Sequence, residues 1–422
     1  MNNTAQPAIT NSQWKIILLS SLGGMLEFYD FVIFVIFAKA IGQTFFPNKT
    51  PLLSIMATFT AFAIGYLARP IGGFIFSHFG DKYGRKHSFL LTITLMGSAT
   101  LLMGLLPSYQ TYGIAMSVIF LLLRIIQGIA VGGEIPGAIT FVSEHVPKKI
   151  AFSCAVLFLA INMGIVLGDA VYAVLHAVFK TNITNDTTWR FAFILGGFLA
   201  IISYIARAKL EESPEYLRFE NAIVRVPLLT LFKSHPHNSI FGIFVVAIQA
   251  TMVSLIYLYT PQYMQLSGHY SHSQIALVSL FGVTLFSLLC VFWGWLADFI
   301  GAKKILTVGC LTLFIFSYIY YDAIIHHHKV FSSMIVLSFF TSMVTGTFSS
   351  ILPRLFPVII RYSGIAFCYN LGFAIFGGLS PLMATYLIHT SKNMLSPILI
   401  IIVVAVLGLI GTIFSRYVTQ QN

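Results

Sequence analysis

Five ionisable side chains interrupt long apolar stretches of the sequence: Glu27, Asp30, Arg69, Arg124 and Asp169. A charged group at the centre of a membrane-spanning helix costs about 2.5 to 3.5 kcal/mol on insertion scales, so such groups are rare and usually functional. Carboxyl groups bind and release protons, and the planar guanidinium of arginine recognises carboxylates through paired hydrogen bonds. These residue types therefore indicate chemistry on protons and on carboxylate-bearing or zwitterionic solutes.

Glu27, Arg69 and Arg124 lie at similar expected depths. At a rise of about 1.5 Å per residue, they are roughly 14 to 20 Å from the helix ends that face the cytoplasmic side of the membrane. Glu27 and Asp30 share a helix face because they are three residues apart. We predict that Glu27 or Asp30 carries a coupled proton and that Arg124 helps to bind the solute. The structural alternative is that Glu27 and Arg124 only neutralise each other, and Asp169 fits a solvated gate equally well.

Polar and aromatic side chains in mid-span are further candidates for a solute site, because amides and hydroxyls orient bound molecules. Their alternative role is hydrogen bonding between packed helices. Together with the arginines above, the predicted solute-binding set is Arg69, Arg124, Gln127, Tyr257, Tyr369 and Asn370.

The composition requires a membrane-embedded fold to hold these residues. Of 422 residues, 57% are hydrophobic and 9% are charged, whereas soluble domains carry about 25% charged residues. Apolar stretches of around 20 residues, enough to cross a bilayer, recur along nearly the whole chain. We predict twelve transmembrane helices, near 14–37, 52–78, 87–106, 112–134, 151–179, 189–208, 238–264, 273–297, 303–322, 330–352, 362–388 and 393–417.

The net charge of +11 reflects membrane topology and needs no nucleic-acid partner. Most of the 24 Lys and Arg residues fall in tails and loops on the side that holds both termini. Positive loops stay in the cytoplasm. We therefore expect both termini to be cytoplasmic, in a bacterial-type inner membrane.

The longest polar break divides the chain into two six-helix halves. The expected organisation is a cytoplasmic tail, a bundle, a cytoplasmic linker, a second bundle and a second tail, at 1–13, 14–206, 207–237, 238–417 and 418–422. Equivalent motifs follow the second and the eighth span: Asp81, Gly84 and Lys86 in one half, and Asp298, Gly301 and Lys303 in the other. The repeat predicts an all-α membrane protein of two pseudo-repeated bundles, with a solute site near the membrane midplane between them.

Several motifs resemble those of a known transporter family. They are Arg69-Pro-Ile-Gly-Gly73 with Gly80-Asp-Lys-Tyr-Gly-Arg-Lys86, Glu27-Phe-Tyr-Asp-Phe31 with Phe45-Phe-Pro47, Arg124-Ile-Ile-Gln-Gly128 with Gly132-Gly-Glu134, Glu212-Ser-Pro214, and Arg361-Tyr-Ser-Gly364 with Tyr369-Asn370. The first pair resembles the signature loop of the major facilitator superfamily. The whole set resembles its metabolite:proton symporter branch, which includes transporters for proline and betaine, shikimate, citrate and 2-oxoglutarate. Sugar porters are the nearest competitor, but a single Gln249 stands where they carry paired glutamines.

The resemblance implies a major facilitator fold and secondary active transport. We expect proton-coupled symport, as uptake, of an organic acid, amino acid or betaine by alternating access. The proton gradient replaces any cofactor, and the expected state is a monomer in the lipid bilayer.

In the resembled signature loop, Asp and Arg can supply charge pairs that lock the cytoplasmic face. If Arg85 pairs with Glu144 in the first half, the second half has lost both partners, since Arg354 stands where Glu144 does. Ala302 stands in the second half where Arg85 stands in the first, so we expect the first half to supply most of the charge lock. The predicted gate set is Asp81, Gly84, Arg85, Glu144, Asp298 and Arg361.

Proton-coupled efflux of a metabolite, siderophore or drug is the main alternative function, because charges inside the membrane do not set the direction of transport. A receptor that binds solute without turnover is a second alternative. A membrane enzyme would need a nucleophile with its base or a metal constellation. The sequence shows neither, so we predict a transporter without catalytic or metal sites, and a solvated loop for the tract His326-His-His328.

Overall fold

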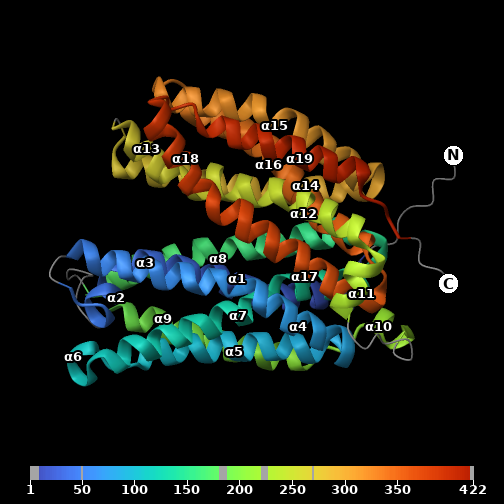
Figure 1. Ribbon diagram of the computed structural model, residues 1–422, viewed down its shortest axis with the longest axis horizontal. Coiled ribbons are helices and arrows are strands. Elements are labelled where there is room, and N and C mark those ends of the chain that lie inside the picture. The colour runs from blue at the N-terminus through green and yellow to red at the C-terminus, as the bar shows by residue number, and fades with distance from the viewer. Residues whose placement is uncertain (1–8, 49–50, 180–187, 220–226, 269, 419–422) are drawn as a thin grey trace. The chain divides into compact units, whose positions relative to one another are not determined.

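The structure, a computed structural model, describes residues 9–48, 51–179, 188–219, 227–268 and 270–418. Every regular element in these ranges is a helix (Figure 1). The first part of the chain forms α1 (Asn11–Ile36), α2 (Ala38–Phe45), α3 (Pro51–Leu67), α4 (Arg69–Tyr83), α5 (Arg85–Leu105), α6 (Tyr109–Tyr112), α7 (Ile114–His145), η1 (Pro147–Lys149), α8 (Ile150–Phe179), α9 (Thr188–Ala208), α10 (Pro214–Phe219) and α11 (Pro227–Ser234).

The rest of the chain continues this all-helical pattern. It forms α12 (Pro236–Met252), η3 (Val253–Leu258), α13 (Thr260–Ser267), α14 (His272–Ile300), α15 (Ala302–Ile325), α16 (Val330–Ile351), η4 (Leu352–Leu355), η5 (Val358–Ile360), α17 (Arg361–Gly372), η6 (Phe373–Gly377), α18 (Gly378–Ser391) and α19 (Pro397–Phe414). The predicted tails at 1–13 and 418–422 and the predicted linker at 207–237 lie partly outside the described residues.

Twelve stretches within the described residues are long and apolar enough to cross a membrane. Helices suit this setting because they satisfy their own backbone hydrogen bonds where water is absent. Large apolar side chains also lie on the outside: Leu67, Ile114 and Leu382 are 68%, 71% and 67% exposed. The predicted all-α fold with twelve spans is therefore confirmed.

The chain folds into two compact units. The first-half unit consists of Leu18–Phe141 and Ala160–Ser213, and within it α5 and α9 run side by side (Figure 1). The other unit consists of Met1–Ile17, Val142–Leu159 and Pro214–Asn422. In it α14, α15 and α16 pack together, and α12 packs against α19. The predicted bundle limits at 14–206 and 238–417 stay a prediction.

Arg69 lies at the junction of α3 and α4. Ala68 separates the two helices but keeps helical dihedral angles, and its N–H and carbonyl bond to Ile64 and Gly72 at 3.1 and 3.2 Å. Pro70 follows directly, and since proline has no N–H it cannot bond to the carbonyl of Tyr66 one turn earlier. The sequence thus places a charged side chain at a local irregularity of an otherwise apolar span.

Glycines bring α7 into backbone contact with α3 and α4. A Cβ atom on Gly128 would overlap the carbonyl oxygen of Gly65, and one on Gly72 would overlap that of Ile129. Any side chain at either position would force these helices apart. This close approach places Arg124 on α7 and Arg69 on α4 against the same cavity.

Carboxylates cap two helix N-termini. Glu212 accepts hydrogen bonds from the backbone N–H groups of Arg85 and Lys86, each at 3.1 Å. Asp298 does the same for Ala151 and Phe152, at 3.0 and 2.9 Å. The first N–H groups of a helix have no partner within the helix and carry partial positive charge, so an anion there is stabilising.

Removal of the Glu212 charge should destabilise the first-half unit. We expect Glu212→Gln to lower the free energy of unfolding by about 1 kcal/mol, because the amide keeps an acceptor but loses the charge. Thermal unfolding of the purified protein in detergent measures this effect. The matched control is Glu211→Gln, since Glu211 is exposed. Equal melting temperatures for the two variants would show that the cap contributes no stability.

Candidate functional site

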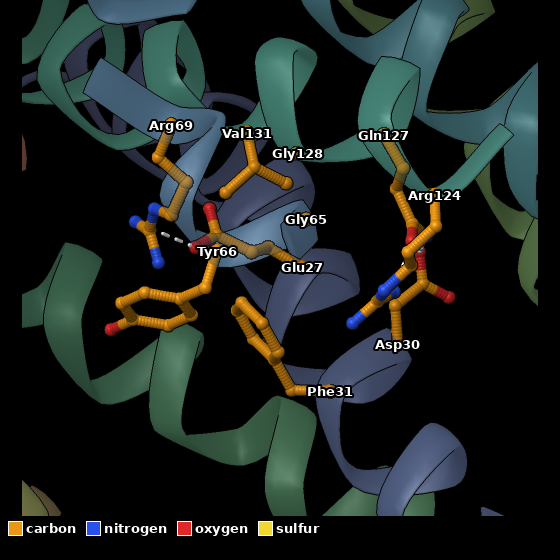
Figure 2. Close-up of a pocket in the computed structure, with 10 residues that line it drawn as sticks. All are labelled: Glu27, Asp30, Phe31, Gly65, Tyr66, Arg69, Arg124, Gln127, Gly128 and Val131. Carbon is orange, nitrogen blue, oxygen red and sulfur yellow. Dashed lines mark hydrogen bonds and ion pairs between the residues drawn. The ribbon is translucent and has the colours of Figure 1, made fainter. Parts of the chain in front are cut away.

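A pocket in the first-half unit gathers most of the charged residues predicted from the sequence. Its cavity volume is about 10 Å³, roughly the space that one water molecule needs. Figure 2 shows two charged groups on either side of Phe31. The pocket is lined by Glu27, Asp30, Phe31, Gly65, Tyr66, Arg69, Arg124, Gln127, Gly128 and Val131.

Glu27 and Arg69 form the first group. Arg69 Nη2 lies 3.1 Å from Glu27 Oε1, and both side chains are almost fully buried. The guanidinium also lies over the Tyr66 ring, with its carbon 4.9 Å from the ring centroid. Within the described residues, Glu27 Oε2 has no hydrogen-bond partner. The carboxylate is therefore neutralised by one arginine but not enclosed by donors.

Asp30, Gln127 and Arg124 form the second group. Asp30 Oδ2 accepts hydrogen bonds from Thr100 Oγ1 at 2.7 Å and from Gln127 Nε2 at 2.8 Å. The other end of the Gln127 amide accepts a hydrogen bond from Arg124. A neutral amide thus links an acid to a base that do not touch directly. Asp30 Oδ1 is buried, and no partner for it exists among the residues that the structure describes.

Arg124 has no carboxylate partner in the described parts of the chain. Its guanidinium carbon lies 4.2 Å from the centroid of Phe34 and 5.0 Å from that of Phe62. Aromatic faces attract cations, but they do not cancel the charge. The structural alternative in which Glu27 neutralises Arg124 is wrong, since the partner of Glu27 is Arg69.

The sequence pattern did not single out another buried ion pair of this unit, Glu134 and Arg207. Arg207 Nη1 lies 2.7 Å from Glu134 Oε1, and both side chains are buried. Glu134 follows two glycines inside an apolar run, which was the available signal. Arg207 lies at the end of its span, so the sequence predicts a loop residue there instead of a buried partner.

Four of the predicted gate residues form ion pairs, each within one of the two units. Arg85 lies 3.2 Å from Asp81, next to Gly84, whose positive φ of 107° suits only glycine. Glu144 lies 3.2 Å from Arg361, and Arg361 also contacts Glu215. Arg85 and Glu144 belong to different units, so their pairing stays a prediction.

The remaining candidates lie outside this pocket. Tyr257, Tyr369 and Asn370 are buried in the other unit. The Tyr257 hydroxyl lies 2.6 Å from that of Thr341, and a shared solute site with the pocket stays a prediction. Asp169 is exposed.

No group of three or more His, Cys, Asp or Glu side chains in the described ranges could hold a metal ion. The His326-His-His328 tract lies at the end of α15 in a turn, where His326 contacts Asp322 at 3.2 Å.

Known proteins resemble this chain over almost its whole length. The proline/betaine transporter of Escherichia coli (strain K12) is 30% identical over 94% of this chain and 82% of its own. The glycine betaine/proline/ectoine/pipecolic acid transporter OusA of Dickeya dadantii is 31% identical over 95% of this chain and 83% of its own. Both alignments extend well beyond the pocket.

A solved structure shares the fold. The proton:xylose symporter XylE, bound to 6-bromo-6-deoxy-D-glucose, superposes with a TM-score of 0.78, covering 96% of both chains at 16% identity. The family model described as Major Facilitator Superfamily matches residues 20–375. The predictions of a transporter fold and of a chain that is not an enzyme are thereby confirmed. The chain is a multi-pass membrane transporter and belongs to the Major Facilitator Superfamily.

Proposed function

We propose that this transporter takes up a small zwitterionic solute of the proline and betaine type together with a proton. The observation that carries this proposal is the division of four buried charges into two unlike groups. Glu27 and Arg69 form a direct ion pair, whereas Asp30 and Arg124 are linked only through Gln127. One group is suited to a proton and the other to a solute with two opposite charges.

The solute site consists of Asp30, Gln127 and Arg124. The solute carboxylate binds Arg124, which has no counter-ion of its own among the described residues. The solute cation lies beside the unpartnered Oδ1 atom of Asp30. A zwitterion thereby supplies a positive charge to Asp30 and a negative charge to Arg124, the two residues that Gln127 connects. The relatives named for proline and betaine support this class, because those molecules carry one positive and one negative charge.

Aromatic rings suit the cationic end of such a solute. The ring of Phe31 lies between the two charged groups (Figure 2) and contacts Phe62 and Tyr66, at centroid distances of 5.5 and 5.9 Å. Quaternary ammonium groups bind favourably to aromatic faces. Both the secondary amine of proline and the trimethylammonium of betaine are cations of the kind that aromatic faces attract.

The proton site is the Glu27–Arg69 pair. A proton on Glu27 removes the carboxylate charge and releases Arg69, so the pocket then carries a net positive charge. That charge favours binding of the solute carboxylate, and by linkage the bound solute favours protonation. Because α1 carries both Glu27 and Asp30, movement of this one helix affects the proton site and the solute site together.

The whole transport cycle requires movement of the two halves. The two six-helix halves rock as a monomer in an inner membrane, with both termini cytoplasmic, and expose the site alternately to each side. Tyr257, Tyr369 and Asn370 supply the second wall of the solute site. The gate pairs, including Arg85 with Glu144, close the cytoplasmic side.

Glu27→Gln should separate solute movement from proton movement. In proteoliposomes we expect this variant to lose accumulation of solute against a gradient. Exchange of labelled for unlabelled solute needs no net proton transfer, so it should persist. Labelled proline and labelled glycine betaine are the probes. Uphill accumulation at the wild-type level would remove Glu27 from the proton role.

Arg124→Gln should abolish solute binding without unfolding the protein. A ligand that binds only the folded protein stabilises it by RT ln(1 + L/Kd), where L is the free ligand concentration. Proline or glycine betaine should therefore raise the melting temperature of the wild-type protein but not of this variant. Arg218→Gln is the control, because Arg218 is exposed on α10. An undiminished ligand-induced shift in Arg124→Gln would place the carboxylate site elsewhere.

A further inference from the structure

The buried pair Glu134–Arg207 lies one helical turn from the proposed proton site. Glu134 extends from α7 and Arg207 from α9, and Glu134 Oε2 accepts a hydrogen bond of 2.6 Å from Thr92 on α5. Neither residue has a place in the proposed solute or proton site. A buried ion pair is often no more stabilising than apolar residues of the same size, so packing alone does not account for it.

Gly23 brings this pair against the helix that carries Glu27. A Cβ atom built on Gly23 would overlap Glu134 Oε1, and it would come within 2.6 Å of Arg207 Nη2. Gly23 and Glu27 are four residues apart and therefore lie on one face of α1, about 6 Å apart along its axis. Helical side chains lean toward the N-terminus. The Glu27 side chain thus leans over Gly23, toward the place where Glu134 meets α1.

Arg207 has hydrogen-bond acceptors besides Glu134. Its Nε donates to the carbonyl of Leu19 at 2.9 Å and its Nη2 donates to that of Ser20 at 2.7 Å. Its guanidinium carbon lies 3.8 Å from the centroid of the Phe89 ring. The cation therefore retains hydrogen bonds and a ring contact when the carboxylate beside it becomes neutral. This is the arrangement that a carboxyl group needs if it is to hold a proton for part of a cycle.

We propose that Glu134 is a second proton carrier, which receives the proton from Glu27 on its way to the cytoplasm. The inference rests on the proton role proposed above for Glu27. The Glu27 carboxyl gives its proton to the Glu134 carboxylate across the space over Gly23, and the resulting Glu27 carboxylate pairs again with Arg69. The proton then passes from Glu134 to water, which restores the Glu134–Arg207 pair.

The charges that act on Glu134 come from a small number of elements. Gly23 of α1 contacts it, with Glu27 one helical turn further along α1, and Arg207 of α9 pairs with it. Arg69 of α4 is held to Glu27. The contacts from α5 are neutral, since they come from Thr92 and Phe89. A change at Glu134 should therefore reach the pH profile of transport mainly through Glu27 and Arg207.

The test compares proton entry with solute exchange in proteoliposomes that contain a pH-sensitive dye, with proline and glycine betaine as solutes. We expect Glu134→Gln to keep exchange of labelled solute and to reduce solute-driven proton entry by about 100-fold or more, the scale on which a lost proton-transfer group acts. Glu134→Asp, which keeps a carboxyl group, should restore part of the proton entry. Proton entry at the wild-type rate in Glu134→Gln would overturn the proposal.

A charge-balanced variant covers the case in which Glu134→Gln also loses exchange. In Glu134→Gln/Arg207→Gln no buried charge is left unpaired at this place. Restored exchange without proton entry supports the relay, and restored exchange with full proton entry overturns it. Loss of exchange in both variants, with normal thermal unfolding, assigns the pair to helix positioning and also overturns the relay.

Glu27→Gln in the same assay separates the two proposals. Normal proton entry in Glu27→Gln would reject the proposed proton site itself. Loss of proton entry in Glu27→Gln together with normal entry in Glu134→Gln would reject only the relay.

Discussion

A carboxylate inside an apolar bilayer needs a counter-charge, and the Glu27–Arg69 pair is where this constraint acts most directly. The desolvation cost of two buried charges is offset only when they lie close together, and here their nearest atoms are 3.1 Å apart. When a proton neutralises the carboxylate, the arginine loses its partner and the cost falls on it. The pair is therefore a two-state element, whose balance both a proton and an anionic group can shift.

The packing of the surrounding helices holds Glu27 and Arg69 in place. Arg69 lies at the start of α4, where its side chain meets Glu27 of α1, and the backbone contact at Gly128 brings α7 close enough to present Gln127 and Arg124. A bulkier residue at that contact would separate the two charged groups of the pocket. Because helices in lipid gain no hydrophobic driving force for association, close backbone packing contributes a larger share of their stability.

Much of the fold followed from composition, because long apolar spans leave helices as the available structure. The charges of the pocket were predictable for the same reason, since an ionisable residue in such a span is conspicuous. The pairing was not predictable. Depth placed Glu27, Arg69 and Arg124 at one level, but the choice of Arg69 as partner depends on the lateral arrangement of α1, α4 and α7, which depth does not specify. Glu134 was named only within a motif, because the predicted fourth span ends at residue 134, whereas α7 continues to His145 and buries Glu134. Its partner Arg207 lies at the end of a span, where a cation is ordinary.

In the proposed cycle, solute binding and proton binding favour each other through Glu27. The most direct measurement is the number of protons taken up when proline or glycine betaine binds to the purified protein, obtained by calorimetry in buffers of different ionisation enthalpy across a range of pH. We predict net proton uptake in the wild-type protein and none in Glu27→Gln, with solute binding retained in both. Solute binding without proton uptake at every pH, or equal uptake in Glu27→Gln, would contradict this coupling.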